Sequence, residues 1–170
     1  MGHAAEREGD QAADCPSCGA PAVGGLSGCR ALFDRLGERE FSDPRYFLMR
    51  RLTVDAYSLQ HPEQVMKSSK SAAAHLTAMC WSMERGRALQ LPAPLKRWVD
   101  GRRRYIRVVP PPPRARGRIT VVSVVGDMDQ AEYERRVAMW ARSAWSAWSA
   151  HWAQARAWVK EAIAEYPCGD

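Results

Sequence analysis

The segment CPSCGAPAVGGLSGC, residues 15–29, places three cysteines in a loop that is rich in glycine and proline. Its CPxCG turn holds Cys15 and Cys18 close together, as zinc knuckles do when they bind one ion through two thiolates. Cys29 adds a third sulfur at the start of a predicted helix, where the positive end of the helix dipole favours a thiolate. Redox CxxC pairs normally follow a strand, and the sequence predicts none before this loop. The segment therefore predicts most of a tetrahedral zinc site.

The fourth ligand has to come from another part of the chain, because Leu32 stands where a second CxxC pair would place a cysteine after Cys29. If two antiparallel helices follow the loop, the end of the second helix returns to the level of Cys29 and carries His61. The sequence thus predicts zinc bound by His61 together with the three cysteines. It leaves open an aspartate, Cys168 or water as the fourth ligand, and a His61 that only caps its helix.

Helical patterns dominate the rest of the chain. Apolar side chains recur at intervals of three and four residues, which is the spacing of one face of a helix. They predict helices over residues 29–41, 44–60, 71–86 and about 127–164. We therefore expect a mainly α fold: an antiparallel bundle of about four helices with an N-terminal zinc-knuckle loop and a basic, proline-rich crossover before the last helix.

The length of 170 residues indicates one domain. We expect residues 1–14 to form a flexible lead, residues 15–165 a single zinc-binding helical domain and residues 166–170 a tail. Within the domain, residues 15–29 form the knuckle loop and residues 96–126 the basic, proline-rich connection.

Two short stretches of this connection have strand character. RYIRVV (104–109) and ITVVSVV (119–125) are rich in β-branched residues and flank a run of four prolines, residues 110–113. The prolines predict a semi-rigid polyproline segment. The two stretches either pair as a short β ribbon or remain extended loop.

Positive charge is concentrated in the same connection. Residues 96–118 contain nine lysines and arginines and a single acid, Asp100, whereas the whole chain has a net charge of only +6. Arg102, Arg103 and Arg104 form the densest group and are candidates for binding an anion. The segment is suited to an acidic protein partner or a nucleic acid, and a solvated loop is the alternative.

Three histidines on or beside the predicted helices suggest an alternative, catalytic function. A cluster of His61, His75 and His151 would be similar to the site of DinB-like metal-dependent thiol transferases and hydrolases, in which the metal keeps an open position. Asp55 and Tyr57 would then orient a ligand or move a proton in this second metal or ligand site. No two histidines have the i, i+4 spacing that places ligands on one helix. The sequence therefore favours a non-catalytic interaction or regulatory module that is stabilised by zinc.

Several short motifs occur together in one known group of proteins: CPSCGA (15–20), SGC (27–29), RLTVDAYSLQHP (51–62), AAHL (73–76), WARSAW (140–145) and AWSAHW (147–152). Through these motifs the chain resembles an uncharacterised bacterial domain-of-unknown-function family of similar length, over most of its residues after residue 14. Members of the family often have a histidine immediately before the RLTVD equivalent, where this chain has Arg50, so no ligand is expected at that position. The resemblance implies a helical, metal-binding protein and supplies no established reaction.

The compartment follows from what the sequence lacks. No run approaches the ~18 apolar residues that span a bilayer, and residues 1–14 have neither the basic start nor the apolar run of a signal peptide. We therefore expect a cytoplasmic protein without a membrane partner, in which the thiols are metal ligands or free. Cys80 fits a buried core position. The seven tryptophans leave a homodimer as an open alternative.

Overall fold

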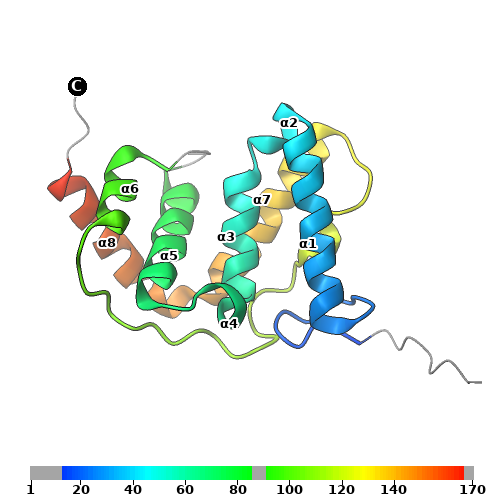
Figure 1. Ribbon diagram of the computed structural model, residues 1–170, viewed down its shortest axis with the longest axis horizontal. Helices are drawn as coiled ribbons and strands as arrows, with labels where there is room; N and C mark the ends of the chain where they lie inside the picture. The colour runs from blue at the N-terminus through cyan, green and yellow to red at the C-terminus, as the bar shows by residue number, and fades with distance from the viewer. Residues whose placement is uncertain (1–12, 86–90, 167–170) are drawn as a thin grey trace, which may run out of the picture.

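The computed structural model describes residues 13–85 and 91–166 of the chain (Figure 1). The helices in order are α1 (Gly25–Ser42), α2 (Pro44–Phe47), α3 (Arg50–Gln60), α4 (Pro62–Val65), α5 (Ser69–Glu84), α6 (Ala93–Asp100), α7 (Gln130–Ala147) and α8 (Trp152–Glu165). Among the described residues there is no β-strand, so the predicted mainly α class is confirmed. Cys168 and nearly all of the predicted lead and tail lie outside the described residues.

Helix α3 lies near the centre of the bundle (Figure 1). It packs against α7 and α5, and α8 packs against α5 and α6. On the other side of α3, α1 packs against α2 and, over a smaller contact, against α3 itself. We call residues 13–24 with α1, α2 and α3 the cluster half, and α5, α6 and α8 the tryptophan half. Helix α7 contacts both halves.

The helices α1, α3 and α5 alternate in direction, as the predicted antiparallel bundle requires (Figure 1). Helix α7 differs, because it runs in the same sense as α3. Near its start, Tyr133 packs edge-on against Tyr46, which precedes α3. At its end, the Trp148 indole donates to the carbonyl of Leu59, in the last turn of α3. The long crossover carries the chain back to the α2 end of the molecule before α7 begins, which permits this parallel pair.

The single helix predicted over about 127–164 is in fact broken after Ala147. A 3-10 turn, Ser149–His151, separates α7 from α8. The carbonyl of Trp145 accepts from the N–H of Trp148 and from the indole of Trp152, both at 3.0 Å. In a continuous α-helix, the carbonyl of Trp145 would accept from the N–H of Ser149, four residues later. The contacts of Trp148 and Trp152 take the place of that bond, and the helix ends although its apolar spacing continues. The helix predicted over 44–60 is also split, into α2 and α3.

The predicted β ribbon does not form. Residues 104–109 are extended but pair with no strand among the described residues, and residues 119–125 contain a 3-10 turn, Val121–Ser123. The spacing of three in that turn buries both Val121 and Val124 in the core, a placement that a flat strand does not give.

The connection predicted over 96–126 also begins later than expected, because α6 extends to Asp100. Pro94 stands in the first turn of α6, where its fixed φ favours a helix start. Leu95 and Trp98 then bury almost completely against the bundle. No helix in the described part of the chain is long and apolar enough to cross a lipid bilayer.

Candidate metal centre

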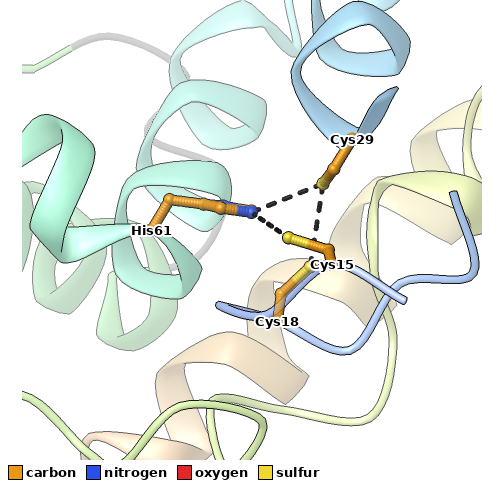
Figure 2. Close-up of side chains that lie close together, drawn as sticks. All are labelled: Cys15, Cys18, Cys29 and His61. Atoms are coloured by element: carbon orange, nitrogen blue, oxygen red, sulfur yellow. Dashed lines mark hydrogen bonds between the residues drawn. The ribbon is translucent and has the colours of Figure 1, made fainter. Parts of the chain in front are cut away.

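The knuckle loop is a tight turn that presents two sulfurs on one side. The N–H of Cys15 donates to the carbonyl of Ala20, and the N–H of Gly19 donates to the carbonyl of Cys15, both at 2.8 Å. Gly19 has a φ of +77°, a left-handed conformation that glycine adopts without steric cost. The turn thereby holds Cys15 and Cys18, both buried, beside the first turn of α1 (Figure 2).

Cys29 lies near the beginning of α1, and the residue before it allows the loop to come close. A Cβ added to Gly28 would lie 1.8 Å from the carbonyl oxygen of Val23, so only glycine permits this approach of loop and helix. The Sγ of Cys29 consequently lies 3.7 Å from the Sγ of Cys18.

His61 supplies the fourth group from the end of α3, where Pro62 follows it. Its Nδ1 lies 2.9 Å from the carbonyl oxygen of Tyr57 and donates a hydrogen bond to it. That bond fixes the tautomer, so Nε2 carries a lone pair. Nε2 lies 3.5 Å from the Sγ of Cys15 and 3.4 Å from the Sγ of Cys29. The imidazole is therefore oriented for ligation by its own helix.

A stack of three rings holds the imidazole from the side. The Tyr57 ring lies 3.9 Å from that of His61 with an interplanar angle of 16°, and the Phe33 ring lies 4.0 Å from that of Tyr57 with the same angle. Because Phe33 belongs to α1 and the other two rings to α3 and its end, the stack joins the two helices beside the sulfurs. Tyr57, proposed from the sequence as part of a second ligand site, belongs to this support instead.

Together, Cys15, Cys18, Cys29 and His61 form what we call the Cys3His cluster (Figure 2). All four are buried, and their ligand atoms lie within 4.8 Å of one another. A tetrahedral zinc ion with bonds of ~2.3 Å to sulfur and ~2.0 Å to nitrogen spaces its ligand atoms about 3.5 to 3.8 Å apart. The three contacts of 3.4, 3.5 and 3.7 Å match the edges of that tetrahedron. The cluster is therefore suited to one four-coordinate metal ion.

The acid-base properties of the three thiols favour a cation at the centre. A hydrogen bond from Cys29 lowers the pKa of Cys18 to about 4. The pKa of Cys29 is raised, mainly by the same hydrogen bond and secondly by burial. Burial also raises the pKa of Cys15. One thiolate thus forms readily, whereas a second and a third would repel it. A divalent cation removes this conflict, because it stabilises several thiolates at once.

The second cluster proposed from the sequence does not form. His75 points its Nδ1 at the buried carboxylate of Asp55, at 2.7 Å, and Arg51 holds the other oxygen of that carboxylate at 2.8 Å. His151 lies in the turn between α7 and α8, and its Nε2 bonds the carbonyl of Val109 at 2.7 Å. Among the described residues, the Cys3His cluster is the one group of three or more histidine, cysteine and acidic side chains that lies within reach of a single ion.

The predicted anion-binding arginines differ from one another. Arg103 makes ion pairs with Glu161 at 2.6 Å and Glu165 at 2.7 Å on α8 and lies over the Trp98 ring. Arg102 and Arg104 are exposed and make no ion pair in the described part of the chain. Arg103 thus contributes to the packing of α6 against α8, whereas its two neighbours are exposed to solvent.

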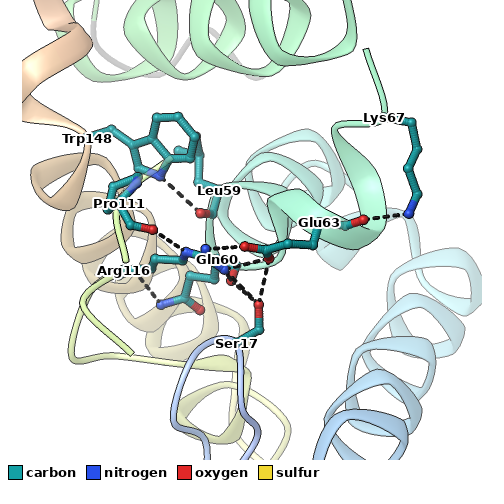
Figure 3. Close-up of polar contacts among 8 residues, drawn as sticks. All are labelled: Ser17, Leu59, Gln60, Glu63, Lys67, Pro111, Arg116 and Trp148. Atoms are coloured by element: carbon teal, nitrogen blue, oxygen red, sulfur yellow. Dashed lines mark hydrogen bonds and ion pairs between the residues drawn. The ribbon is translucent and has the colours of Figure 1, made fainter. Parts of the chain in front are cut away.

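A buried arginine beneath the knuckle loop is the residue that sequence reasoning missed (Figure 3). Arg116 is 1% exposed and donates to the Ser17 hydroxyl at 2.8 Å, to the Gln60 carbonyl at 3.3 Å and to both oxygens of Glu63. Its guanidinium holds the pKa of Glu63 below its usual value. The arginine therefore ties the knuckle loop to the end of α3 and the start of α4, beside the Cys3His cluster.

We call Arg116 and its partners Ser17, Gln60 and Glu63 the clamp. The sequence contains a partial signal for it. Ser17 and Gln60 each stand next to a cluster ligand in the chain, at Cys18 and His61. Gln60 is fully buried, and its side chain accepts from the Trp140 indole at 2.8 Å. Nothing in the local sequence distinguishes Arg116 from the other arginines of the basic segment.

A buried Cys3His cluster at one end of a helical bundle defines the class of this protein as a helical protein with a candidate metal site. The chain belongs to the family described as "Family of unknown function (DUF5946)", whose model matches residues 13–149. This confirms the resemblance to an uncharacterised domain. No curated protein and no solved structure matches the chain.

Proposed function

We propose that the protein binds one zinc ion through the Cys3His cluster and that this zinc is structural. The observation that carries the proposal is the convergence of four buried ligand atoms within 4.8 Å, from three separate parts of the chain. The ion would join the knuckle loop, the start of α1 and the end of α3. Because the four ligands are brought together only when the chain folds, the free energy of binding the metal would contribute directly to folding.

The ligand set supports zinc over other metals. Thiolate and imidazole ligands in a tetrahedron favour zinc, whereas calcium and magnesium require oxygen ligands. The cluster also supplies all four positions, and catalytic zinc sites leave one open for water or substrate. A closed, buried site supports a non-catalytic role. The same thiol chemistry supports a reducing, cytoplasmic compartment.

A non-catalytic module of this kind acts by binding a partner. The exposed cations of residues 96–118 that lack a carboxylate, Arg102 and Arg104 among them, support an acidic partner. The interaction or regulatory role and a homodimer remain predictions that partner-binding and sedimentation experiments would test.

Metal counting tests the structural-zinc proposal. We expect elemental analysis of the purified protein to find one zinc per chain, retained through dialysis. Cys29→Ser and His61→Ala are expected to lose most of it, because three ligands hold zinc far more weakly than four. Cys80→Ser is the matched control, since Cys80 is equally buried but lies outside the cluster. Full zinc content in both ligand variants would contradict the proposal.

A further inference from the structure

Residues 102–113 form an extended segment that runs along one edge of the molecule, from the tryptophan half towards the knuckle loop (Figure 1). We call it the strap. It is held at several points although it has no regular secondary structure. The Tyr105 hydroxyl donates to the carbonyl of Trp98 at 3.0 Å. Further along, the carbonyl of Pro111 accepts from Nε of Arg116 at 2.9 Å.

The side chains of the strap alternate as those of a β-strand do. Arg103 and Tyr105 are partly buried against the bundle, whereas Arg102, Arg104 and Ile106 are exposed. The alternation shifts by one at residue 107, after which Val108 packs inwards and Val109 is exposed. A period of two places one set of side chains on the protein and the other in solvent, as in a half-buried strand.

In the described part of the chain, residues 102–108 of the strap lack the backbone partners that a strand normally has. Beyond them, the carbonyls of Val109 and Pro111 bond His151 and Arg116, and the prolines at 110–113 have no N–H. Within the described residues, no backbone-to-backbone hydrogen bond involves residues 102–111. An ordered strand with free N–H and C=O groups is a template for another strand. Peptide recognition by strand addition uses such an edge for affinity and alternate side chains for specificity.

The exposed side chains indicate the chemistry of the added strand. Arg102, Arg104 and Arg107 are exposed and have no carboxylate partner among the described residues. The cations of this region that form ion pairs are Arg103, Arg114 and Arg116. Two large aliphatic side chains stand among them, Ile106 at 61% and Val109 at 74% exposure. The strap thus presents cations and aliphatic side chains on one outward face.

We propose that the strap binds an extended acidic peptide of a partner protein, which adds to it as a β-strand. Glutamates or aspartates of the peptide would lie opposite Arg102 and Arg104, and aliphatic residues opposite Ile106 and Val109. The inference rests on the proposed function in one respect: it names the class of partner that the non-catalytic module would bind. It does not depend on which metal the Cys3His cluster binds.

The strap fits a peptide better than a nucleic acid or a second copy of the chain. Proteins that bind single-stranded nucleic acids stack bases on exposed aromatic rings. The aromatic ring of the strap, Tyr105, instead packs edge-on against Trp98, with ring centroids 5.0 Å apart. A second copy of the strap would place arginines opposite arginines, which is unfavourable across a strand pair.

Fluorescence anisotropy tests the proposal with a labelled peptide of about ten residues. On the face that would meet the exposed side chains of the strap, the peptide carries glutamate opposite Arg102 and Arg104 and valine opposite Ile106 and Val109. Two further peptides have the same sequence but carry N-methyl groups on alternate backbone nitrogens. In the first peptide the methyl groups lie along one edge of the strand, and in the second they lie along the other edge. We expect the unmodified peptide to bind saturably. One N-methylated peptide should bind about tenfold or more weakly, because it loses several N–H donors, and the other should bind nearly as well.

Protein variants test the same proposal from the other side. The double variant R102Q/R104Q is expected to weaken peptide binding about tenfold, through the loss of charge-assisted contacts. The matched control is R142Q, because Arg142 is an exposed arginine on α7 and does not belong to the strap. Zinc is measured in every sample. Unchanged zinc with lost peptide binding separates the strap from the metal site.

Several results would overturn the inference. The first is equal binding of the three peptides, since charge alone would then explain it. The second is absence of saturable binding to the unmodified peptide while the protein holds its full metal content. The third is tighter binding of a labelled oligothymidine of equal length. A concentration-dependent dimer in sedimentation that I106D abolishes would assign the strap to a second copy instead.

Discussion

Each half of this bundle is stabilised internally by a different kind of interaction. The cluster half brings a glycine-rich loop, α1 and α3 together around small thiols, one imidazole and a buried arginine. The tryptophan half packs large indoles: Trp98 packs against Tyr105 and Trp158, with ring centroids 5.0 and 6.1 Å away. The comparison teaches that one short chain can combine a half stabilised by coordination and polar contacts with a half stabilised by apolar burial.

This difference predicts that the two halves respond to different perturbations. Burying a large apolar side chain stabilises a fold by about 1.5 to 3 kcal/mol, so the tryptophan half should depend on volume and temperature. Structural zinc supplies an apparent ~10 kcal/mol or more in small peptides at neutral pH, so the cluster half should depend on metal and acid.

Removal of the metal is expected to have the largest effect and would separate the halves most clearly. We expect a chelator strong enough to extract zinc, or the variant Cys29→Ser, to cost ~5 kcal/mol or more of stability in the cluster half. Hydrogen exchange followed by mass spectrometry should show early loss of protection in residues 13–24 and α1, while α5 and α8 remain protected. Equal loss of protection in both halves would break the comparison.

Truncation of Trp98 is the reciprocal perturbation. Trp98→Ala should lower the free energy of unfolding by about 3 to 5 kcal/mol, because the cavity cannot collapse fully between two aromatic neighbours. Zinc content should stay at one per chain. Chemical denaturation and elemental analysis measure the two quantities. The milder variant is Trp98→Phe, since the buried indole N–H has no acceptor to lose. A Trp98→Ala protein that folds but loses zinc would show that the halves are not separate.

The clamp beneath the knuckle loop should give an intermediate effect. Arg116→Met keeps much of the side-chain volume but removes the hydrogen bonds to Ser17 and Glu63. We expect a loss of about 2 to 3 kcal/mol in stability and about tenfold weaker zinc binding, measured by competition with a chromophoric chelator. Arg142→Gln is the control for removal of one positive charge. Unaltered zinc affinity in Arg116→Met would detach the clamp from the metal site.

The smallest expected effect is the labelling of Cys80 by a thiol reagent. It compares a buried thiol of the tryptophan half with a thiol of the Cys3His cluster. Burial raises the pKa of Cys80 to about 12, whereas the pKa of Cys18 without metal is lowered to about 4. The thiolate is the reactive form, so at pH 8 a raised pKa leaves only ~0.01% of Cys80 reactive. After chelation, which we expect to expose the knuckle loop while α5 stays folded, iodoacetamide at pH 8 should label Cys18 and spare Cys80. Mass spectrometry identifies the labelled peptides. Equal labelling of the two cysteines would contradict these environments.

The candidate site was largely predictable because its residues are marked by local chemistry. The spacing of Cys15 and Cys18 fixes a turn, and Cys29 follows at a helix start. His61 required one step of tertiary reasoning, that two consecutive helices run in opposite directions, and the structure places its Nε2 3.4 Å from the Cys29 sulfur. Arg116 was not predictable, since its burial depends on a crossover path that no local pattern encodes.

The fold was predictable in class but not in its interruptions. The helical periodicity predicted α1 and α5 to within about four residues at each end and placed the end of α3 at Gln60, because each helix buries one apolar face. The break after Ala147 accompanies indole contacts that helical periodicity does not encode: one is local, from Trp152 to the carbonyl of Trp145, and one is long-range. The Trp148 indole bonds the carbonyl of Leu59 across 89 positions of the chain, and such a contact has no signature in either segment alone.

X-ray absorption spectroscopy at the zinc edge of the purified protein tests the central claim most directly. The account predicts one zinc per chain with three sulfur neighbours at ~2.3 Å and one imidazole nitrogen at ~2.0 Å. The spectrum of Cys80→Ser should be the same as that of the unaltered protein. A shell dominated by oxygen ligands, or a folded protein that contains no metal and has the same helix content, would contradict it.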